Sequence, residues 1–171
     1  MYQGIGLDAF NAWPERRAAY ALYECANSLR LSRELARRRP YSDHTALFLQ
    51  ADALLFAMPE AEIDEILEAC PEVGRRPRSP RSHAEQCSVW DDDVSVMARL
   101  SAAAETYTRR FGFGFVMFVN GQCAADVAAA VTDRMHNDLD TERKVVRNEL
   151  ARVNRSRLER MLGPEGGYQN W

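Results

Sequence analysis

A cysteine, a serine, a glutamate, a glutamine and an arginine have the types and spacing of a small chemical site. Cys70 ends an apolar helical pattern, and a loop rich in proline and arginine follows it. Ser82, Glu85 and Gln86 are three and four residues apart, so a helix would place them on one face. We expect this stretch to form one pocket wall from two elements, with Arg157 as a fixed cation.

These residue types suit proton transfer on a small polar acid. An arginine binds a carboxylate, serine and glutamine bind carbonyl or amide edges, and a glutamate or thiol moves a proton. Cys70 and Glu85 have no histidine at metal-ligand spacing, so no metal site and no hydrolytic triad are predicted. His44 and His136 stand at a helix start and a helix end, where capping or solvent roles are expected, and His83 falls on another face than Glu85.

Arg157 interrupts the apolar stripe of the last predicted helix. It follows Val153 by four residues, in line with Val146 and Leu150. A guanidinium that faces a core needs an acidic partner or an anionic ligand, because leaving it unpaired is costly. The alternative is a side chain whose stem lies on the core while its charged end reaches solvent.

Length and composition predict one globular domain over residues 1–162, with a mobile tail over residues 163–171. The net charge of −3 does not indicate a nucleic-acid partner, and the arginines clustered at 37–39 and 75–81 are expected to be solvated or to face a ligand. The absence of a leader and of any run of eighteen apolar residues predicts a cytoplasmic protein without a membrane segment. Four cysteines without CxxC pairing predict reduced thiols.

Helical periodicity predicts an all-α single-domain bundle. The expected helices are residues 14–28, 28–39, 45–58, 59–70, 82–88, 91–110, 124–135 and 141–162, with caps from Ser28, Ser42 or Asp43, and the acidic trio 91–93. Residues 111–119, FGFGFVMFV, read alone as a buried strand. No second strand is predicted to pair with it, so a buried extended connector or a short helix is equally expected.

Several motifs, taken in order, resemble the 2-oxo-4-hydroxy-4-carboxy-5-ureidoimidazoline (OHCU) decarboxylase family over nearly the whole chain. Residues 82–86, SHAEQ, are similar to that family's SxxEQ, and residues 107–116 are similar to its YxxxFGFPFV. Together, in this order and at this distance, the two motifs are a specific signal. Weaker similarity covers Phe10-Asn11, Ser28 with residues 36–41, residues 66–74, Asn137-Asp138 and residues 149–158.

The resemblance implies a cofactor-free carboxy-lyase, a small cyclic carboxylic acid as substrate and a homodimer. It implies that Glu85 is an acid or base and that Arg157 holds a carboxylate or carbonyl. It implies substrate contacts from Pro71, Ser82, Gln86, Phe113, Phe115 and Val116.

The sequence departs from the family pattern at one chemically important position. Cys70-Pro71 stands where the family has His-Pro, so the histidine on which decarboxylation depends is replaced. A thiol with a pKa of about 8.5 stays protonated at neutral pH and can donate a proton, but it accepts one poorly. The alternative is that Cys70 is a small apolar filler. Two further departures are Ser28-Leu29-Arg30 for the family's SPW and Gly114 for the proline of FGFPFV.

Three functions remain open at this point. The favoured hypothesis is a divergent cofactor-free carbon–carbon lyase, or a related proton-transfer enzyme, that acts on a small cyclic carboxylic acid in a specialised biosynthetic pathway. The second is OHCU decarboxylation to (S)-allantoin in urate degradation, with Glu85 in place of the histidine. The third is a binding protein that keeps the pocket without the chemistry.

Overall fold

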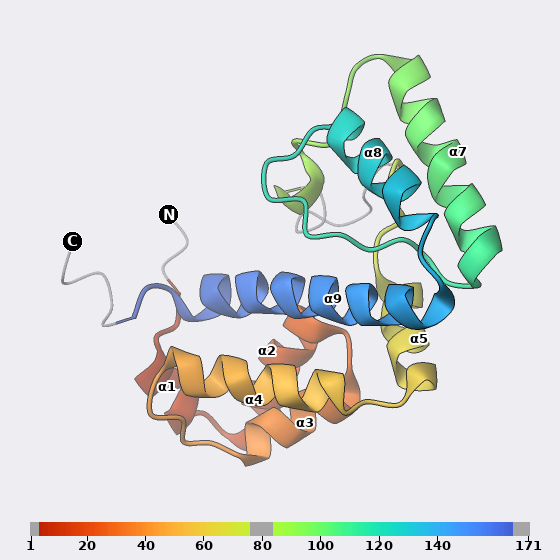
Figure 1. Ribbon diagram of the computed structural model, residues 1–171. Helices are drawn as coiled ribbons and strands as arrows, with labels where there is room; N and C mark the ends of the chain where they lie inside the picture. The colour runs from red at the N-terminus through yellow and green to blue at the C-terminus, as the bar shows by residue number, and fades with distance from the viewer. Residues whose placement is uncertain (1–3, 76–83, 166–171) are drawn as a thin grey trace. The chain divides into compact units, whose positions relative to one another are not determined.

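The described part of the chain is helical. The computed structural model describes residues 4–75 and 84–165, and no strand occurs among them. The helices are α1 (Leu7–Ala12), α2 (Glu15–Ala26), α3 (Leu29–Arg37), α4 (His44–Phe56), α5 (Glu60–Ala69), α7 (Val94–Phe111), α8 (Ala124–Arg134) and α9 (Leu139–Leu162), as Figure 1 shows. Residues 84–86 form a further helical turn. The predicted all-α class is confirmed.

Side-chain caps fix several of the predicted helix starts. The Ser28 hydroxyl and the Asp43 carboxylate each accept a hydrogen bond from the backbone N–H three residues on, at 3.3 Å and 2.7 Å. Asp93 accepts one from the N–H of Ser95 at 2.8 Å, which confirms the acidic trio as a helix start. Helix α7 ends at Gly112, whose φ of 82° is the left-handed conformation that glycine adopts readily.

Helix α1 has no counterpart among the predicted helices. It is six residues long, and its N-cap makes no side-chain hydrogen bond. The Arg39 guanidinium donates to the carbonyls of Phe10 at 2.6 Å and Trp13 at 2.8 Å. A tertiary contact therefore stabilises a helix too short to form alone. The expectation that Arg39 is solvated or faces a ligand is wrong, because its guanidinium binds main-chain carbonyls.

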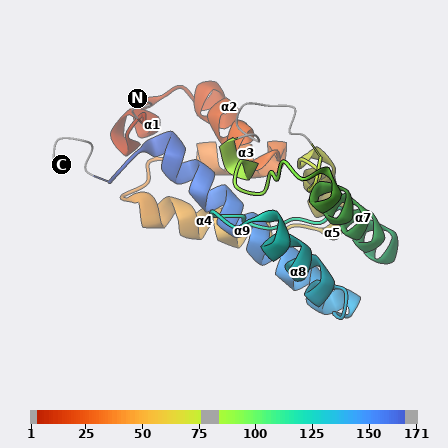
Figure 2. The ribbon, with the colours of Figure 1, turned by 90° about the horizontal axis from the view of Figure 1, so that it is seen from above.

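The chain divides into two compact units, Met1–Ile66 with Ala151–Trp171, and Leu67–Leu150. We call them the first and the second unit. In the first unit α2 packs against α3, and α3 packs against α4, as Figure 1 and Figure 2 show. Its largest fully buried side chains are Phe10, Leu22, Leu31, Leu35, Leu47, Leu55, Ile63 and Leu162. The predicted single domain over residues 1–162 stays a prediction.

Residues just after α9 make contacts within the first unit. The Glu165 carboxylate accepts a hydrogen bond from the His44 N–H at 3.3 Å. His44 is buried and its ring lies 5.9 Å from that of Phe48, so the expected solvent role for this histidine is wrong. The rest of the predicted tail, residues 166–171, lies outside the described residues.

In the second unit α7 packs against α8. Between them residues 112–123 form no regular element, and we call this segment the connector. It is extended rather than a strand, which decides between the alternatives left open by the sequence. Its side chains Phe113, Phe115 and Val116 are buried together with Leu100, Tyr107, Val127, Val131 and Val146.

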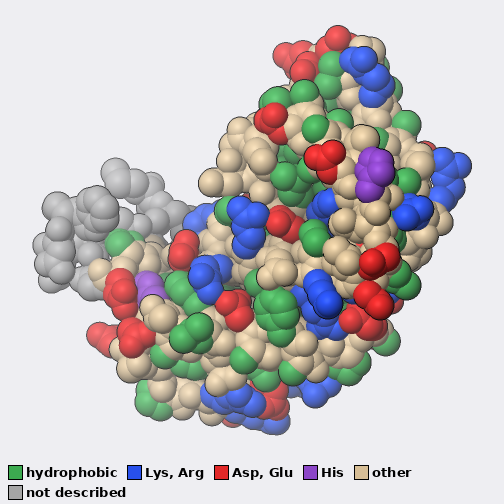
Figure 3. Space-filling view, viewed as in Figure 1, with side chains coloured by type: hydrophobic (Ala, Val, Ile, Leu, Met, Phe, Trp, Pro, Cys, Tyr) green, Lys and Arg blue, Asp and Glu red, His purple; other side chains and the backbone are tan. Residues whose placement is uncertain are grey.

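Charges of both signs are interspersed on the face of the molecule that Figure 3 shows, with no broad area of one sign. Among the helices described, none is both long enough and apolar enough to cross a lipid bilayer.

Candidate functional site

Most of the predicted site residues belong to the second unit. They are Cys70, Pro71, Glu85, Gln86, Phe113, Phe115 and Val116. Arg157 belongs to the first unit, and Ser82 lies outside the described residues.

Cys70 directly follows α5. Its N–H donates to the Leu67 carbonyl at 3.1 Å, which continues the last turn of the helix. The preceding residues on the predicted face, Ile63, Ile66 and Leu67, are buried as expected. Cys70 itself is half-buried and is not part of a disulfide.

A glycine fixes the loop that follows Cys70-Pro71. Gly74 has a φ of 83°, and a Cβ atom built on it would lie 2.9 Å from the backbone nitrogen of Ser101 on α7. Only glycine permits this approach without strain. The next residue, Arg75, forms ion pairs with Glu72 at 2.7 Å and with Glu105 of α7 at 3.6 Å. The loop is thus held on α7 by close packing and by charge.

Glu85 and Gln86 lie on the helical turn at residues 84–86, and both are half-buried. The Gln86 carbonyl accepts the N–H of Val89 at 3.0 Å, and the Val89 side chain is buried. This contact anchors the turn to the core of the second unit and leaves both polar side chains partly accessible. The prediction that Ser82 shares their face stays a prediction.

The connector is packed on an aromatic cluster around Tyr107. The ring of Tyr107 lies 4.8 Å from Phe111, 6.0 Å from Phe113 and 5.1 Å from Phe115, and its side chain is fully buried. Edge-to-face contacts at these distances favour one arrangement of the rings. The FGFGF pattern therefore uses alternate aromatic residues to fix the path of the main chain.

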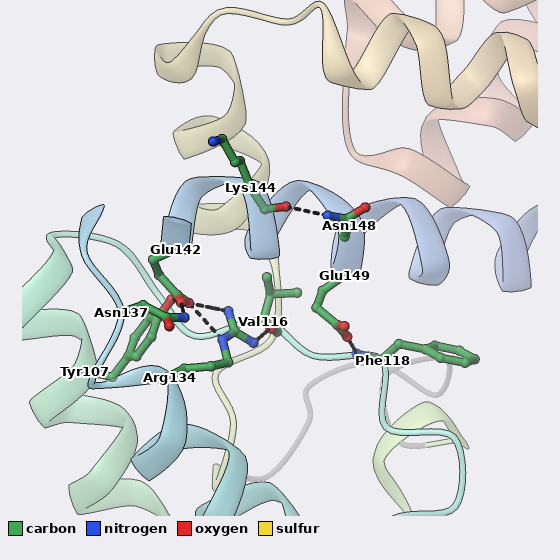
Figure 4. A network of polar contacts seen from close by, with 9 residues as sticks. All are labelled: Tyr107, Val116, Phe118, Arg134, Asn137, Glu142, Lys144, Asn148 and Glu149. Carbon is green, nitrogen blue, oxygen red and sulfur yellow. Dashed lines mark hydrogen bonds and ion pairs between the residues drawn. The ribbon is translucent and has the colours of Figure 1, made fainter. Parts of the chain in front are cut away.

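A buried polar network lies beside the connector, as Figure 4 shows. The Glu142 carboxylate is fully buried and accepts hydrogen bonds from the Tyr107 hydroxyl, from Arg134 Nε at 2.8 Å and from Asn137 Nδ2 at 2.7 Å. Arg134 also donates to the Val116 carbonyl at 2.6 Å. Burial, followed by the hydrogen bond to Glu142, raises the pKa of Tyr107, so its hydroxyl stays a donor.

Apart from Val116, no residue of this network is among the predicted site residues. Tyr107 and Asn137 fall inside motifs of the resemblance, but the resemblance gives them no role. Glu142 is one of several acidic residues on α9, and Arg134 ends α8 beside other polar residues. No periodicity distinguishes a buried acid from an exposed one in such a helix. The only sequence signal was their position beside YxxxFGF and ND.

Arg157 is buried, as its position on the apolar stripe predicts. The residue is 9% exposed, and its Nη1 atom donates a hydrogen bond to the Cys25 carbonyl at 2.9 Å within the first unit. The alternative in which its charged end reaches solvent is therefore wrong. A main-chain carbonyl satisfies one of the five guanidinium donors.

No group of three or more His, Cys, Asp or Glu side chains that could hold a metal ion occurs in residues 4–75 and 84–165. The predicted site residues described in the second unit offer a thiol, a carboxylate and an amide. They can bind and orient a small acid and exchange a proton with it.

These features define an all-helical protein, within its described residues, with a buried aromatic connector and half-buried polar residues at 70, 85 and 86. The family model for OHCU decarboxylase matches residues 11–159. The chain belongs to the OHCU decarboxylase family, and is thus an OHCU decarboxylase-like protein of the carboxy-lyase class.

Curated relatives carry the same family name. The chain is 32% identical over 131 residues to the 2-oxo-4-hydroxy-4-carboxy-5-ureidoimidazoline decarboxylase of Haloferax volcanii, covering 69% of this chain and 76% of the relative. It is 29% identical over 108 residues to the protein of that name from Halalkalicoccus jeotgali, covering 61% of each. It is 22% identical to the uric acid degradation bifunctional protein of a Bacillus species, covering 80% of this chain and 28% of that protein.

Solved structures have the same fold. A crystal structure of OHCU decarboxylase in the presence of (S)-allantoin matches with a TM-score of 0.75 at 18% identity, covering 88% of this chain and 99% of that one. A crystal structure of (S)-allantoin synthase matches with a TM-score of 0.74 at 15% identity, covering 92% of this chain and 54% of that one. At such low identity these matches support the fold alone.

Proposed function

We propose that this protein is a cofactor-free decarboxylase that acts on a small cyclic carboxylic acid. The observation that carries the proposal is one substitution within a retained site. Glu85 and Gln86 stand as in the family motif, but Cys70 occupies the position of the family's histidine. Retention of Glu85 together with replacement of the histidine by Cys70 favours related chemistry on a different or a broader set of ring acids.

Each proposed role follows from the chemistry of the side chain. Arg157 binds the substrate carboxylate, because a guanidinium presents two parallel donors to two oxygens. Ser82 and Gln86 orient the ring through its carbonyl and amide edges, and Pro71 shapes the loop behind it. Phe113, Phe115 and Val116 exclude water and contribute main-chain groups.

The main chain of the connector has donors to offer. The N–H groups of residues 114–117 donate no hydrogen bond to any residue within the described part of the chain. A backbone N–H normally has a partner, which is water or a ligand where protein supplies none. Successive N–H groups of an extended segment point in alternating directions, so those on one side of the connector suit the carbonyl or carboxylate oxygens of a ring acid.

The proposed reaction needs only acid–base groups. The carbon–carbon bond to the carboxylate breaks, carbon dioxide leaves, and the bonding electrons pass into the substrate ring. A proton from the enzyme then adds to one face of the resulting carbanion or enolate. Cys70 is the proposed donor to that face, and Glu85 moves the proton on the substrate's hydroxyl or ring nitrogen. We further expect a cytoplasmic homodimer.

A second candidate is decarboxylation of OHCU itself. The 32% identity with the Haloferax volcanii protein of that name favours it. Under this hypothesis Glu85 performs the proton transfer of the missing histidine, and the replacement of that histidine by Cys70 is tolerated.

The decisive test adds purified protein to freshly generated OHCU and then to other cyclic carboxylic acids, while carbon dioxide release and circular dichroism are followed. Glu85→Gln should lower turnover by about 100-fold or more, as expected for loss of general acid–base catalysis. Glu68→Gln, on the exposed side of α5, is the matched control and should leave turnover unchanged. Binding of a ring acid without carbon dioxide release from any of them would instead support a non-catalytic binding protein.

A further inference from the structure

Two charged side chains from different helices bind the connector main chain at nearly adjacent residues. Arg134, the last residue of α8, donates from Nη1 to the Val116 carbonyl at 2.6 Å. Glu149 of α9 accepts the Phe118 N–H at Oε2, at 2.7 Å. Figure 4 shows the two contacts, from Arg134 to Val116 and from Phe118 to Glu149. The peptide groups that flank Met117 are therefore held from both sides.

Both contacts are hydrogen bonds to ionised groups, which are stronger than bonds between neutral groups. An extended segment without regular structure has no ladder of backbone bonds to fix its peptide planes. Here side chains of α8 and α9 take over that function. These two contacts fix the peptide planes on either side of Met117.

The Arg134 anchor is itself fixed. Its Nε and Nη2 atoms lie 2.8 Å and 2.6 Å from Glu142 Oε1, and its guanidinium carbon lies 4.3 Å from the centre of the Phe115 ring. Arg134 thus contacts the connector at two places, the ring of Phe115 and the main-chain carbonyl of Val116. Because Glu142 is fully buried, the guanidinium has little freedom to rotate.

We infer that Arg134 and Glu149 are positioning residues that hold the connector so that N–H groups within residues 114–117, which donate to no described residue, bind the oxygens of a ring acid. This inference rests on the proposed function for the identity of the ligand. It adds two residues that do not touch the substrate. Their effect is to remove the cost of ordering the connector when the substrate binds.

Glu149 is the better residue to test, because it is half-buried and lies outside the Arg134–Glu142 ion pair. Glu149→Leu removes the acceptor. Glu149→Gln keeps an acceptor oxygen in the same place and is the conservative rescue. Glu68→Leu and Glu68→Gln on exposed α5 are matched controls.

The first measurement is amide hydrogen exchange of the full chain without ligand. We expect Glu149→Leu to speed exchange of the Phe118 amide by about tenfold or more, with the helical amides of α7 unchanged. Glu149→Gln should restore most of the protection. Unchanged exchange at Phe118 in Glu149→Leu would overturn the inference, whatever the protein's activity.

The second measurement is the Kd for (S)-allantoin by calorimetry, with exchange repeated in its presence. We expect the ligand to protect the amides of residues 114–117, and Glu149→Leu to weaken binding about tenfold while Glu149→Gln and both Glu68 variants do not. Absence of binding by the native protein, or an unchanged Kd in Glu149→Leu, would overturn the inference. Binding with the expected losses but no turnover of any ring acid would overturn the proposed function alone.

Discussion

The guanidinium of Arg134 and the fully buried carboxylate of Glu142 form an ion pair of 2.6 Å beside the connector. The pair joins the end of α8 to the first turns of α9, and Tyr107 of α7 donates to the same carboxylate oxygen. Three helices of the second unit therefore meet at one acidic group. A buried charge held by several donors costs much free energy once a partner is removed.

Glu142→Gln should destabilise the protein by about 3–5 kcal/mol, because it leaves the Arg134 charge without a counter-charge in a buried place. The free energy of unfolding in urea measures this loss. Glu105→Gln on α7 breaks an ion pair of 3.6 Å with Arg75 at the surface and should cost less than about 1 kcal/mol. Equal losses in the two variants would show that the buried pair has no special role.

Tyr41→Phe should lower the free energy of unfolding at neutral pH. This difference from the native protein should become smaller at alkaline pH. The Tyr41 hydroxyl donates to the Leu35 carbonyl at 2.8 Å, so its removal costs about 1 kcal/mol. Burial raises the pKa of Tyr41 to about 12, above the value of about 10 in the unfolded chain. The contribution of the Tyr41 hydroxyl to the free energy of unfolding is therefore fully present below about pH 10. It declines as the pH rises toward 12, by at most about 1.4 kcal/mol per pH unit.

Urea unfolding of the native protein and of Tyr41→Phe between pH 8 and 11.5 measures this difference. The gap in stability should be constant up to about pH 10 and then narrow. Tyr20→Phe is the control, because Tyr20 is 67% exposed. A gap that stays constant through pH 11.5 would contradict a raised pKa for Tyr41.

Much of the fold could be predicted from the sequence, because helix starts and buried faces depend on local signals. Ser28, Asp43 and Asp93 cap helices as expected, and the apolar face of α5 is buried. Helix α1 could not be predicted, since a distant arginine stabilises it.

The candidate site was predictable by residue type and much less by contact. The inward position of Arg157 follows from its place in the helical stripe, but its bond to the Cys25 carbonyl depends on a helix more than a hundred residues away. The network around Glu142 gave no signal, because burial of one acid among many is decided by tertiary packing.

Gly74→Ala should destabilise the protein more than Gly121→Ala. Both glycines have a positive φ, 83° and 76°, so both variants carry the same backbone strain of about 1 kcal/mol. The added Cβ at residue 74 would also lie 2.9 Å from the Ser101 nitrogen, whereas at residue 121 it meets nothing within 4 Å. The difference in unfolding free energy between the variants therefore reports the close packing of the loop on α7. Equal losses of unfolding free energy in the two variants would show that α7 moves to accommodate the added Cβ atom without loss of stability.

Cys70→Ala should lower turnover of the preferred ring acid by about 100-fold, because the proposed proton donor is lost. The product should also lose optical purity, since solvent can then protonate either face of the intermediate. Cys87→Ala is the matched control, because that thiol is exposed and is not part of the proposed site. Rate and optical purity within twofold of the native values would instead make Cys70 a filler.

Cys70→His separates the two enzymatic hypotheses by restoring the residue type of the family motif. If the native protein is tuned to another ring acid, this variant should convert OHCU at least about tenfold faster than the native protein does, because imidazole both donates and accepts a proton at neutral pH. Production of (S)-allantoin is followed by circular dichroism against the uncatalysed background. Rapid OHCU turnover by the native protein, with no gain in Cys70→His, would contradict retuning and would support OHCU decarboxylation with a thiol at this position.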